Sequence, residues 1–227
     1  MSLASYKARV RNDGGSIQGA SNNITRKAQF ELIRNSPSRS TVGLHSKDNL
    51  EFALVSDIDT YEKRRFLFNP DVKTYKGDYI YHDDFIYLVT NHTIDNNFPQ
   101  SIALLCNYDF PVRVEEITTH EIIGRRPSGQ PIYKIEPITH TIPSAVTSKF
   151  YSAVENAVFS LPEGVMYAYL PYRPDEPSPQ LDQEVLIYDQ QYFVADIIKT
   201  NILNFGGIDK GYIELRMQRV QKNGNLE

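Results

Sequence analysis

Two stretches of the chain share one pattern of apolar and polar positions. Residues 80–89 form an aromatic and β-branched run that Asp83 and Asp84 interrupt. Such a run is typical of two strands joined by a tight turn. Residues 186–195 can be laid on it at a constant offset, with Asp189 under Asp83. The pattern predicts two copies of one β-module, about a hundred residues apart; the alternative is a chance likeness of two short hairpins.

The flanking segments extend the repeat. Residues 66–70 precede the first copy as residues 167–171 precede the second, and final strands are expected over 101–108 and 211–220. The predicted fold class is mainly β, with two small β-barrel-like modules behind an N-terminal arm and a short helix. Four parts are expected: 1–47, the arm and helix; 48–110, the first β-module; 111–160, a connecting β-hairpin segment; and 161–227, the second β-module.

A helix is predicted over residues 25–35, because Ala28, Leu32 and Ile33 can line one side of it. Residues 1–21 are polar and are expected to be extended or disordered in isolation, and to become ordered on a partner. The helix with its basic arm is interpreted either as a docking element for another chain or for phosphate, or as a solvated extension.

A long β-hairpin is predicted downstream, with arms at 111–117 and 121–135 and a tip at 125–131. Its arms lack a consistent apolar face, so part of it should project from the body. The arginines at the tip could reach a neighbouring subunit or nucleic acid, and an ordinary solvated loop is the alternative. Residues 144–159 fit either a helical face or strands.

Composition and charge place the chain among globular proteins with an uneven charge distribution. Of its 227 residues, 41% are hydrophobic, enough for a core, and 15 Tyr with 11 Phe favour β-structure. The net charge is −4, but residues 1–40 hold seven Lys or Arg against two acidic residues, or +5, which leaves −9 for the remainder. A basic arm on an acidic body follows. No signal peptide or membrane span is evident, so a soluble intracellular product is expected.

Motifs for catalysis and metal binding are missing from the sequence. It has no G-x-S-x-G elbow and no glycine-rich phosphate loop. The single cysteine, Cys106, cannot form an internal disulfide and is expected to pack in the core. Asp57 and Asp59, and the run His82 to Asp84, are interpreted as turns rather than as cation sites. We expect no enzyme activity, no metal and no cofactor.

A distinctive pattern lies within four segments, residues 48–55, 63–70, 76–90 and 104–108. It consists of Gly-Asp, a strand, a short turn, an aromatic-Leu-Val-Thr run and Leu-Cys-Asn. With the second module counted, roughly residues 48–220 resemble a group of structural proteins from the neck of tailed phages and prophages of Gram-positive bacteria. This sequence departs from the family at Tyr87, where Trp is expected, and it lacks the Trp expected shortly after Leu-Cys-Asn.

The resemblance implies a head-tail connector of the head-closure type, assembled in the host cytoplasm and located in the neck of the virion. Copies would form a homo-oligomeric ring that binds the portal or an adaptor protein, offers a face to a tail protein and continues the channel for double-stranded DNA without binding it specifically. No membrane partner is implied. Interface residues are hypothesised at Arg9, Arg11, Arg26, Lys27, Phe30, Arg34, Arg125 and Arg126.

Two other functions stay open at this point. A tail-completion or tail-terminator protein belongs to the same class of virion proteins. A barrel-type nucleic-acid-binding module belongs to another class and would use Tyr79, Tyr81 and Tyr87 as a stacking platform. Alternation along the strands predicts that several of these rings are buried instead.

Overall fold

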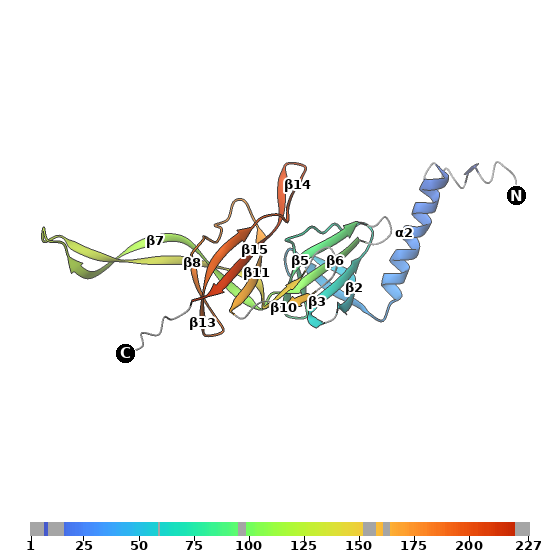
Figure 1. Cartoon of the computed structure of the whole chain (residues 1–227). Helices are drawn as coiled ribbons and strands as arrows, with labels where there is room; N and C mark the ends of the chain where they lie inside the picture. The colour runs from blue at the N-terminus through green and yellow to red at the C-terminus, as the bar shows by residue number, and fades with distance from the viewer. Residues whose placement is uncertain are drawn as a thin grey trace. The chain divides into compact units, whose positions relative to one another are not determined.

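The computed structural model describes residues 7–8, 16–58, 60–94, 99–151, 158–160 and 164–220. They form a mainly β chain with an N-terminal helix, which confirms the predicted fold class. The chain divides into two compact units, residues 1–105 and 106–227 (Figure 1). We call them the first and the second unit.

The first unit is a helix followed by a closed β-barrel. Its strands are hydrogen-bonded in the order β1-β2-β3-β6-β5-β4, and β4 pairs back with β1. Side chains such as Phe66, Phe68 and Tyr87 are at most 1% exposed and fill the interior. The elements are α2 (Ile17–Asn35), β1 (Arg39–Leu44), β2 (Leu50–Ile58), β3 (Thr60–Phe68), β4 (Tyr79–His82), β5 (Phe85–Ile94) and β6 (Pro99–Leu105).

The second unit is a sheet that curls into a nearly closed barrel. Its main path is β12-β13-β15-β11-β8-β7, with β14 paired to β15 and a separate pair of β9 and β10. Phe110, Leu170 and Val194 are among its buried core residues. The strands are β7 (Tyr108–Arg125), β8 (Pro131–Thr147), β9 (Lys149–Tyr151), β10 (Val158–Ser160), β11 (Val165–Tyr172), β12 (Glu184–Ile187), β13 (Gln190–Ile198), β14 (Ile202–Phe205) and β15 (Ile208–Arg219).

The two units share one strand order. Strands β1 to β6 correspond, in chain order, to β7, β8, β11, β12, β13 and β15. With this correspondence, the order of neighbouring strands is the same in both sheets. Even a local irregularity recurs, because a shift of register follows Val89 on β5 and Val194 on β13. Bulges of this kind are specific features of a sheet. This agreement supports the predicted internal duplication.

The structure corrects the register of the repeat by one residue. The hairpin turns have positive φ at Asp83 and Asp84 in the first unit, and at Tyr188 and Asp189 in the second. Asp84, not Asp83, is therefore the counterpart of Asp189. Either of the adjacent aspartates can be aligned with Asp189 in the sequence. The fold decides between them, because a slip of one residue exchanges the two faces of a strand.

A proline explains why the second barrel is not closed by a backbone ladder. In the first unit, Gly43 of β1 pairs with Tyr81 of β4. The two barrels can be matched residue by residue by following the paired residues from strand to strand. In this match, Pro111 on β7 occupies the position that Gly43 has on β1. Proline has no N–H to donate. Two side chains bridge the seam instead: the Tyr108 hydroxyl donates to the Leu186 carbonyl (2.8 Å), and Gln183 Nε2 donates to the Pro111 carbonyl (2.5 Å).

The helix begins earlier than the predicted 25–35 and runs from Ile17 to Asn35. The Ser16 hydroxyl accepts a hydrogen bond from the Gly19 N–H (3.0 Å), which is the geometry of an N-cap. Residues 17–21, expected to be extended, are therefore helical. The polar first turns lack an apolar period, so only the cap residue signalled this start.

The predicted hairpin is confirmed, and its arms are longer than expected. β7 and β8 pair from Tyr108 and Ser144 at the base to Arg125 and Pro131 beside the turn. The base of the hairpin also supplies core residues to the second unit, whereas the prediction placed 111–160 in a connecting segment. The ambiguous stretch 144–159 contains the end of β8 and the strand β9, and its residues 152–157 lie outside the described part.

Substitution of Gly211 by alanine is expected to destabilise the second unit by about 2–4 kcal/mol, because a backbone clash cannot be relieved by side-chain rotation. A Cβ there would lie 2.7 Å from the Cα of Ile202 and closer still to the Asn201 carbonyl oxygen. Gly124→Ala is the control, since its Cβ would meet only Ile132 Cδ1, at 3.8 Å. Urea unfolding of both variants measures the difference, and equal midpoints would contradict the close approach.

Candidate assembly surfaces

Helix α2 rests on the first barrel through a small contact. It touches β1 and β2, and Ile33 and Gln29 are 1% and 4% exposed. Both amide atoms of Gln29 are buried without a hydrogen-bond partner in the described part of the chain. An unsatisfied buried polar group costs on the order of 1–3 kcal/mol. The apolar part of this attachment is thus a single side chain, Ile33, and the buried amide of Gln29 opposes it.

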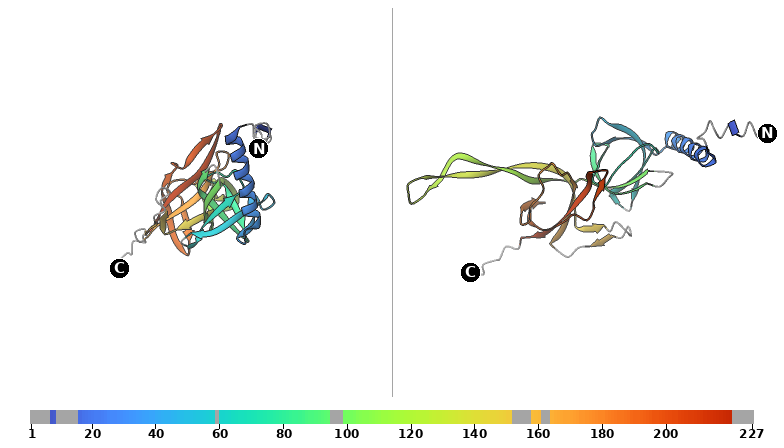
Figure 2. Two further views of the ribbon diagram at one scale, coloured as in Figure 1. Left: turned by 90° about the vertical axis from the view of Figure 1, so that its right-hand side faces the viewer. Right: turned by 90° about the horizontal axis from the view of Figure 1, so that it is seen from above.

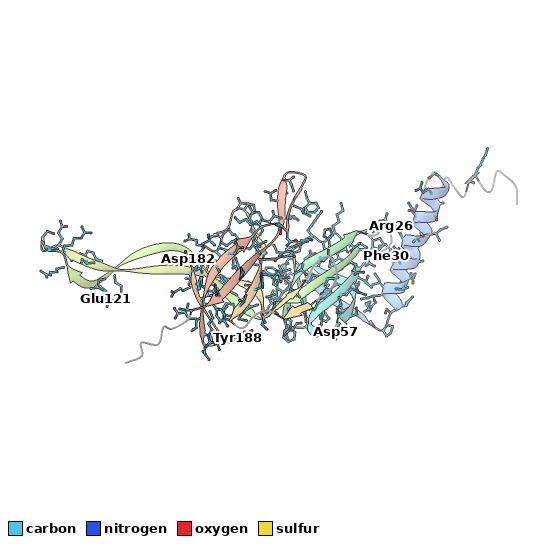
Figure 3. The ribbon with its side chains drawn as sticks, in the orientation of Figure 1. Arg26, Phe30, Asp57, Glu121, Asp182 and Tyr188 are labelled. Atoms are coloured by element: carbon cyan, nitrogen blue, oxygen red, sulfur yellow. The ribbon has the colours of Figure 1, made fainter. Side chains whose placement is uncertain are left out.

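The outer side of the same helix is apolar. Ile24 and Leu32 are 62% and 53% exposed, and Ala28, also exposed, stands between them at helical spacing. Phe30 is 38% exposed on a flank of the helix (Figure 3). Contiguous exposed apolar side chains are characteristic of interaction sites. We call Ile24, Ala28 and Leu32 the outer helix face.

The basic residues of the N-terminal region that were predicted to form an interface differ in their surroundings. Arg26 forms an ion pair with Asp71, which follows β3, so it fastens the helix to the barrel. Arg34 lies 3.8 Å from Glu31 on the helix itself. Lys27 is exposed. Arg9 and Arg11 lie outside the described residues.

The other predicted interface residues stand at the end of the hairpin. Between Arg125 and Pro131 the chain turns, closed by a hydrogen bond from the Arg126 N–H to the Gln130 carbonyl (2.8 Å). Arg125 and Arg126 are exposed, and neither side chain has a partner among the described residues. The structure thus brings these two arginines together, while the helix residues belong to the other unit.

Large apolar residues surround this turn. Ile122 and Ile123 on β7 are 52% and 62% exposed, and Ile132 and Tyr133 on β8 are 39% and 41% exposed. Below them, Glu121 and Lys134 form an ion pair across the ribbon (3.2 Å). We call Ile122, Ile123, Arg125, Arg126, Ile132 and Tyr133 the hairpin tip.

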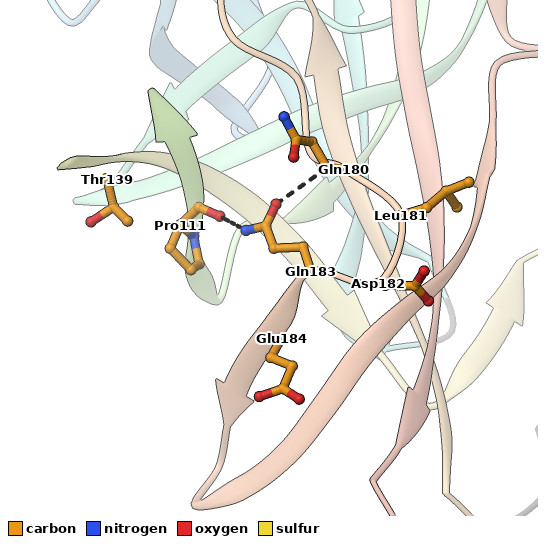
Figure 4. A pocket seen from close by; sticks show the side chains of 7 residues that line it. All are labelled: Pro111, Thr139, Gln180, Leu181, Asp182, Gln183 and Glu184. Carbon is orange, nitrogen blue, oxygen red and sulfur yellow. Dashed lines mark hydrogen bonds between the residues drawn. The ribbon is translucent and has the colours of Figure 1, made fainter. Parts of the chain in front are cut away.

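A cavity that no sequence pattern predicted lies at the seam of the second barrel. It has a volume of about 400 Å³ and opens between the hairpin base and the segment before β12 (Figure 4). Gln183 crosses it, donating to the Pro111 carbonyl and accepting from the Gln180 N–H (3.2 Å). The remaining lining residues are Thr139, Leu181, Asp182 and Glu184.

An exposed stripe continues from this cavity along β12. Residues of this strand alternate between core and solvent, so Glu184 and Leu186 point outward. Leu181, Leu186 and Tyr188 are 59%, 62% and 61% exposed. The Asp182 N–H donates to the Val194 carbonyl (2.9 Å), while its exposed carboxylate has no partner among the described residues. We call Leu181, Asp182, Glu184, Leu186 and Tyr188 the β12 surface, which is acidic at one end and apolar at the other.

A partly buried polar cluster links three strands of the first barrel. Arg64 on β3 donates through Nε to Asp57 (2.9 Å), and its Nη1 lies 2.9 Å from Nδ1 of His82. A guanidinium can only donate, so His82 accepts at Nδ1 and is neutral. Asp83 Oδ2 lies 3.3 Å from the same nitrogen. Burial outweighs this exposed carboxylate and lowers the pKa of His82 below its usual value of 6.5.

Acidification is expected to loosen the first barrel around His82. Because the folded state has the lower pKa, the unfolded state binds more protons as the pH falls below about 6.5, so stability present above that pH is lost. Burial lowers the pKa of His92 as well. Hydrogen exchange of β4 and β5 amides at pH 7.5 and 5.5, corrected for intrinsic rates, should show a larger loss of protection in the wild type than in His82→Gln. Equal losses would contradict this role.

The aromatic stacking platform of the nucleic-acid hypothesis is not present on the barrel surface. Tyr79 and Tyr87 are 5% and 1% exposed, and Tyr81 is half-buried. Two of its three rings therefore pack in the core, as alternation predicted. The described residues also bring no three His, Cys, Asp or Glu side chains together as metal ligands. No helix in that part of the chain is both long and apolar enough to cross a membrane.

Residues 108–218 match the family model of the YomX C-terminal domain. YomX is a protein of a Bacillus prophage region. The matched residues span the hairpin and the barrel of the second unit. No curated protein and no solved structure matches the chain. The second unit is therefore similar to a phage-associated domain family.

Proposed function

We propose that this chain is a structural protein of the phage neck. Copies form a ring that joins the portal of the head to the tail and continues the DNA channel. It acts by assembly and not by catalysis. The resemblance of roughly residues 48–220 to neck proteins supports the proposal, and so does the match of the second unit to a phage-associated domain.

The observation that carries the proposal is the hairpin. From Pro111 to Arg125 it runs fourteen residue steps, on the order of 45 Å at about 3.3 Å per residue. Between Pro131 and Pro143, the only described partner of β8 is β7. An isolated two-stranded ribbon is marginally stable in water. A projecting ribbon with exposed isoleucines is therefore suited to contact another protein.

The barrels and the N-terminal helix complete the assembly. Head-to-tail contacts between identical barrels close into a ring when the rotation between neighbours allows it. The net negative charge of residues 41–227 favours a channel wall to which DNA does not adhere. The outer helix face and the basic arm before it dock on the portal.

The size of the purified chain tests this function. Light scattering followed by negative-stain imaging, with and without the portal protein of the same phage, should show a ring, or a monomer that becomes a ring on the portal. A chain that stays monomeric and ignores the portal would remove the proposal.

A further inference from the structure

We infer that the hairpin tip of one copy binds the β12 surface of the next copy and that this contact builds the ring. The inference rests on the proposed function and names the two surfaces that meet. One is a basic and apolar tip, and the other is an acidic and apolar surface beside the open seam of the second barrel.

The two surfaces complement each other in charge and in apolar character. At the tip, two arginines without described partners adjoin four exposed apolar side chains. On the β12 surface, Asp182 and Glu184 adjoin Leu181, Leu186 and Tyr188. Glu184 is held by Gln191 Nε2 (2.6 Å), which leaves its other carboxylate oxygen for a partner. Arginine forms strong bidentate pairs with carboxylates, and apolar contact around such pairs excludes water.

The contact must join different copies. Pro111 and Thr139 at the base of the hairpin line the cavity that adjoins the β12 surface. The tip therefore lies on the order of 40 Å from the β12 surface of its own chain, at the far end of a paired ribbon. Figure 2 shows the ribbon running outward from the second unit without folding back. Because the hairpin tip and the β12 surface are two different, distant surfaces of one chain, their contact between copies is heterologous, or head-to-tail. This is the kind of interface that generates rings.

The β12 surface lies beside the open seam of the second barrel. In the first barrel, β4 pairs with β1. In the second, Pro111 prevents the corresponding ladder, so β12 is paired along one edge only among the described strands. The cavity at this gap has room for side chains from outside. A neighbour's tip would cover the gap and bury apolar residues on both sides.

Charge reversal with rescue tests the contact. Arg125→Glu with Arg126→Glu should weaken ring formation at least tenfold, measured by analytical ultracentrifugation of the full chain, with portal protein if the wild type needs it. Adding Asp182→Lys and Glu184→Lys to the same chain should restore rings. Lys47→Glu with Lys73→Glu is the control, because it makes the same change of charge on exposed residues of the first unit and should leave rings unchanged.

The outcomes separate the inference from the proposed function. If the variant with both arginines reversed forms rings as well as the wild type does, the inference alone is overturned. The same holds if it loses ring formation and the lysines at 182 and 184 do not restore it. A wild type that forms no ring with or without portal would overturn the proposed function. Should the fourfold variant misfold by circular dichroism, Ile123→Ser and Leu186→Ser replace it; each removes an exposed apolar side chain, and rings unaffected by both would overturn the contact.

Discussion

Replacement of residues 116–137 by Asn-Gly is expected to abolish ring formation while both barrels stay folded. Glu115 pairs with Ile138, so a two-residue turn can close the shortened hairpin in the same register. Among residues 121–134 and 138–141, the part of 113–141 whose side chains the structure describes, none belongs to the core cluster of the second unit. The change removes the whole tip and thus every contact that it makes on a neighbour.

The size of this effect follows from the apolar area involved. Full burial of an isoleucine contributes about 1.5–3 kcal/mol, and each 1.4 kcal/mol is a tenfold change in the dissociation constant. Loss of three isoleucines and two arginines should weaken association at least a thousandfold. Sedimentation velocity should show monomers at concentrations where the wild type forms rings, with an unchanged far-ultraviolet spectrum. If the shortened chain still forms rings, the contact between subunits lies outside the hairpin tip and the prediction is wrong.

Deletion of residues 1–36 is expected to abolish binding to the portal and to leave self-association intact. The cut preserves β1, whose residue Arg39 pairs with Leu54, whereas a cut after residue 40 would remove two paired residues of this strand. The barrel loses the cover that Ile33 and Gln29 provide and the ion pair between Arg26 and Asp71. The deletion should lower portal affinity at least a hundredfold in a pull-down titration.

A point variant separates the helix from the arm. Ile24→Glu with Leu32→Glu introduces glutamate, a good helix former, and removes the two largest apolar side chains of the outer helix face. It should lose most of the portal binding while circular dichroism stays unchanged. Lys47→Gln with Lys73→Gln makes the same change of net charge on exposed barrel residues without touching that face, and it should bind normally. Full binding by the deleted chain would show that the helix is not the portal contact.

The sequence predicted the elements that depend on local patterns. Alternating apolar residues and the aspartate turns located both modules, and the composition around Arg125 located the hairpin turn. The register of the repeat was displaced by one residue, because the first turn holds two adjacent aspartates, Asp83 and Asp84, and either can be aligned with Asp189. The helix start at Ile17 was missed, since its only local signal was the cap at Ser16.

The β12 surface could not be predicted, for a physical reason. Its exposed residues alternate with core residues of a short strand, so they look like the solvent face of any antiparallel sheet. What distinguishes them is the seam beside β12, which arises where Pro111 occupies the position of Gly43. That correspondence is visible only when both barrels have been traced strand by strand. The open seam thus depends on tertiary structure and not on a motif.

Location in the particle tests the central claim most directly. Particles of the phage that encodes this chain, labelled with gold-conjugated antibody against it and imaged by negative stain, should carry label at the junction of head and tail. Tail-less heads with the portal should bind the added chain at one vertex. Label at the distal end of the tail, or intact particles that lack the chain, would contradict the neck assignment.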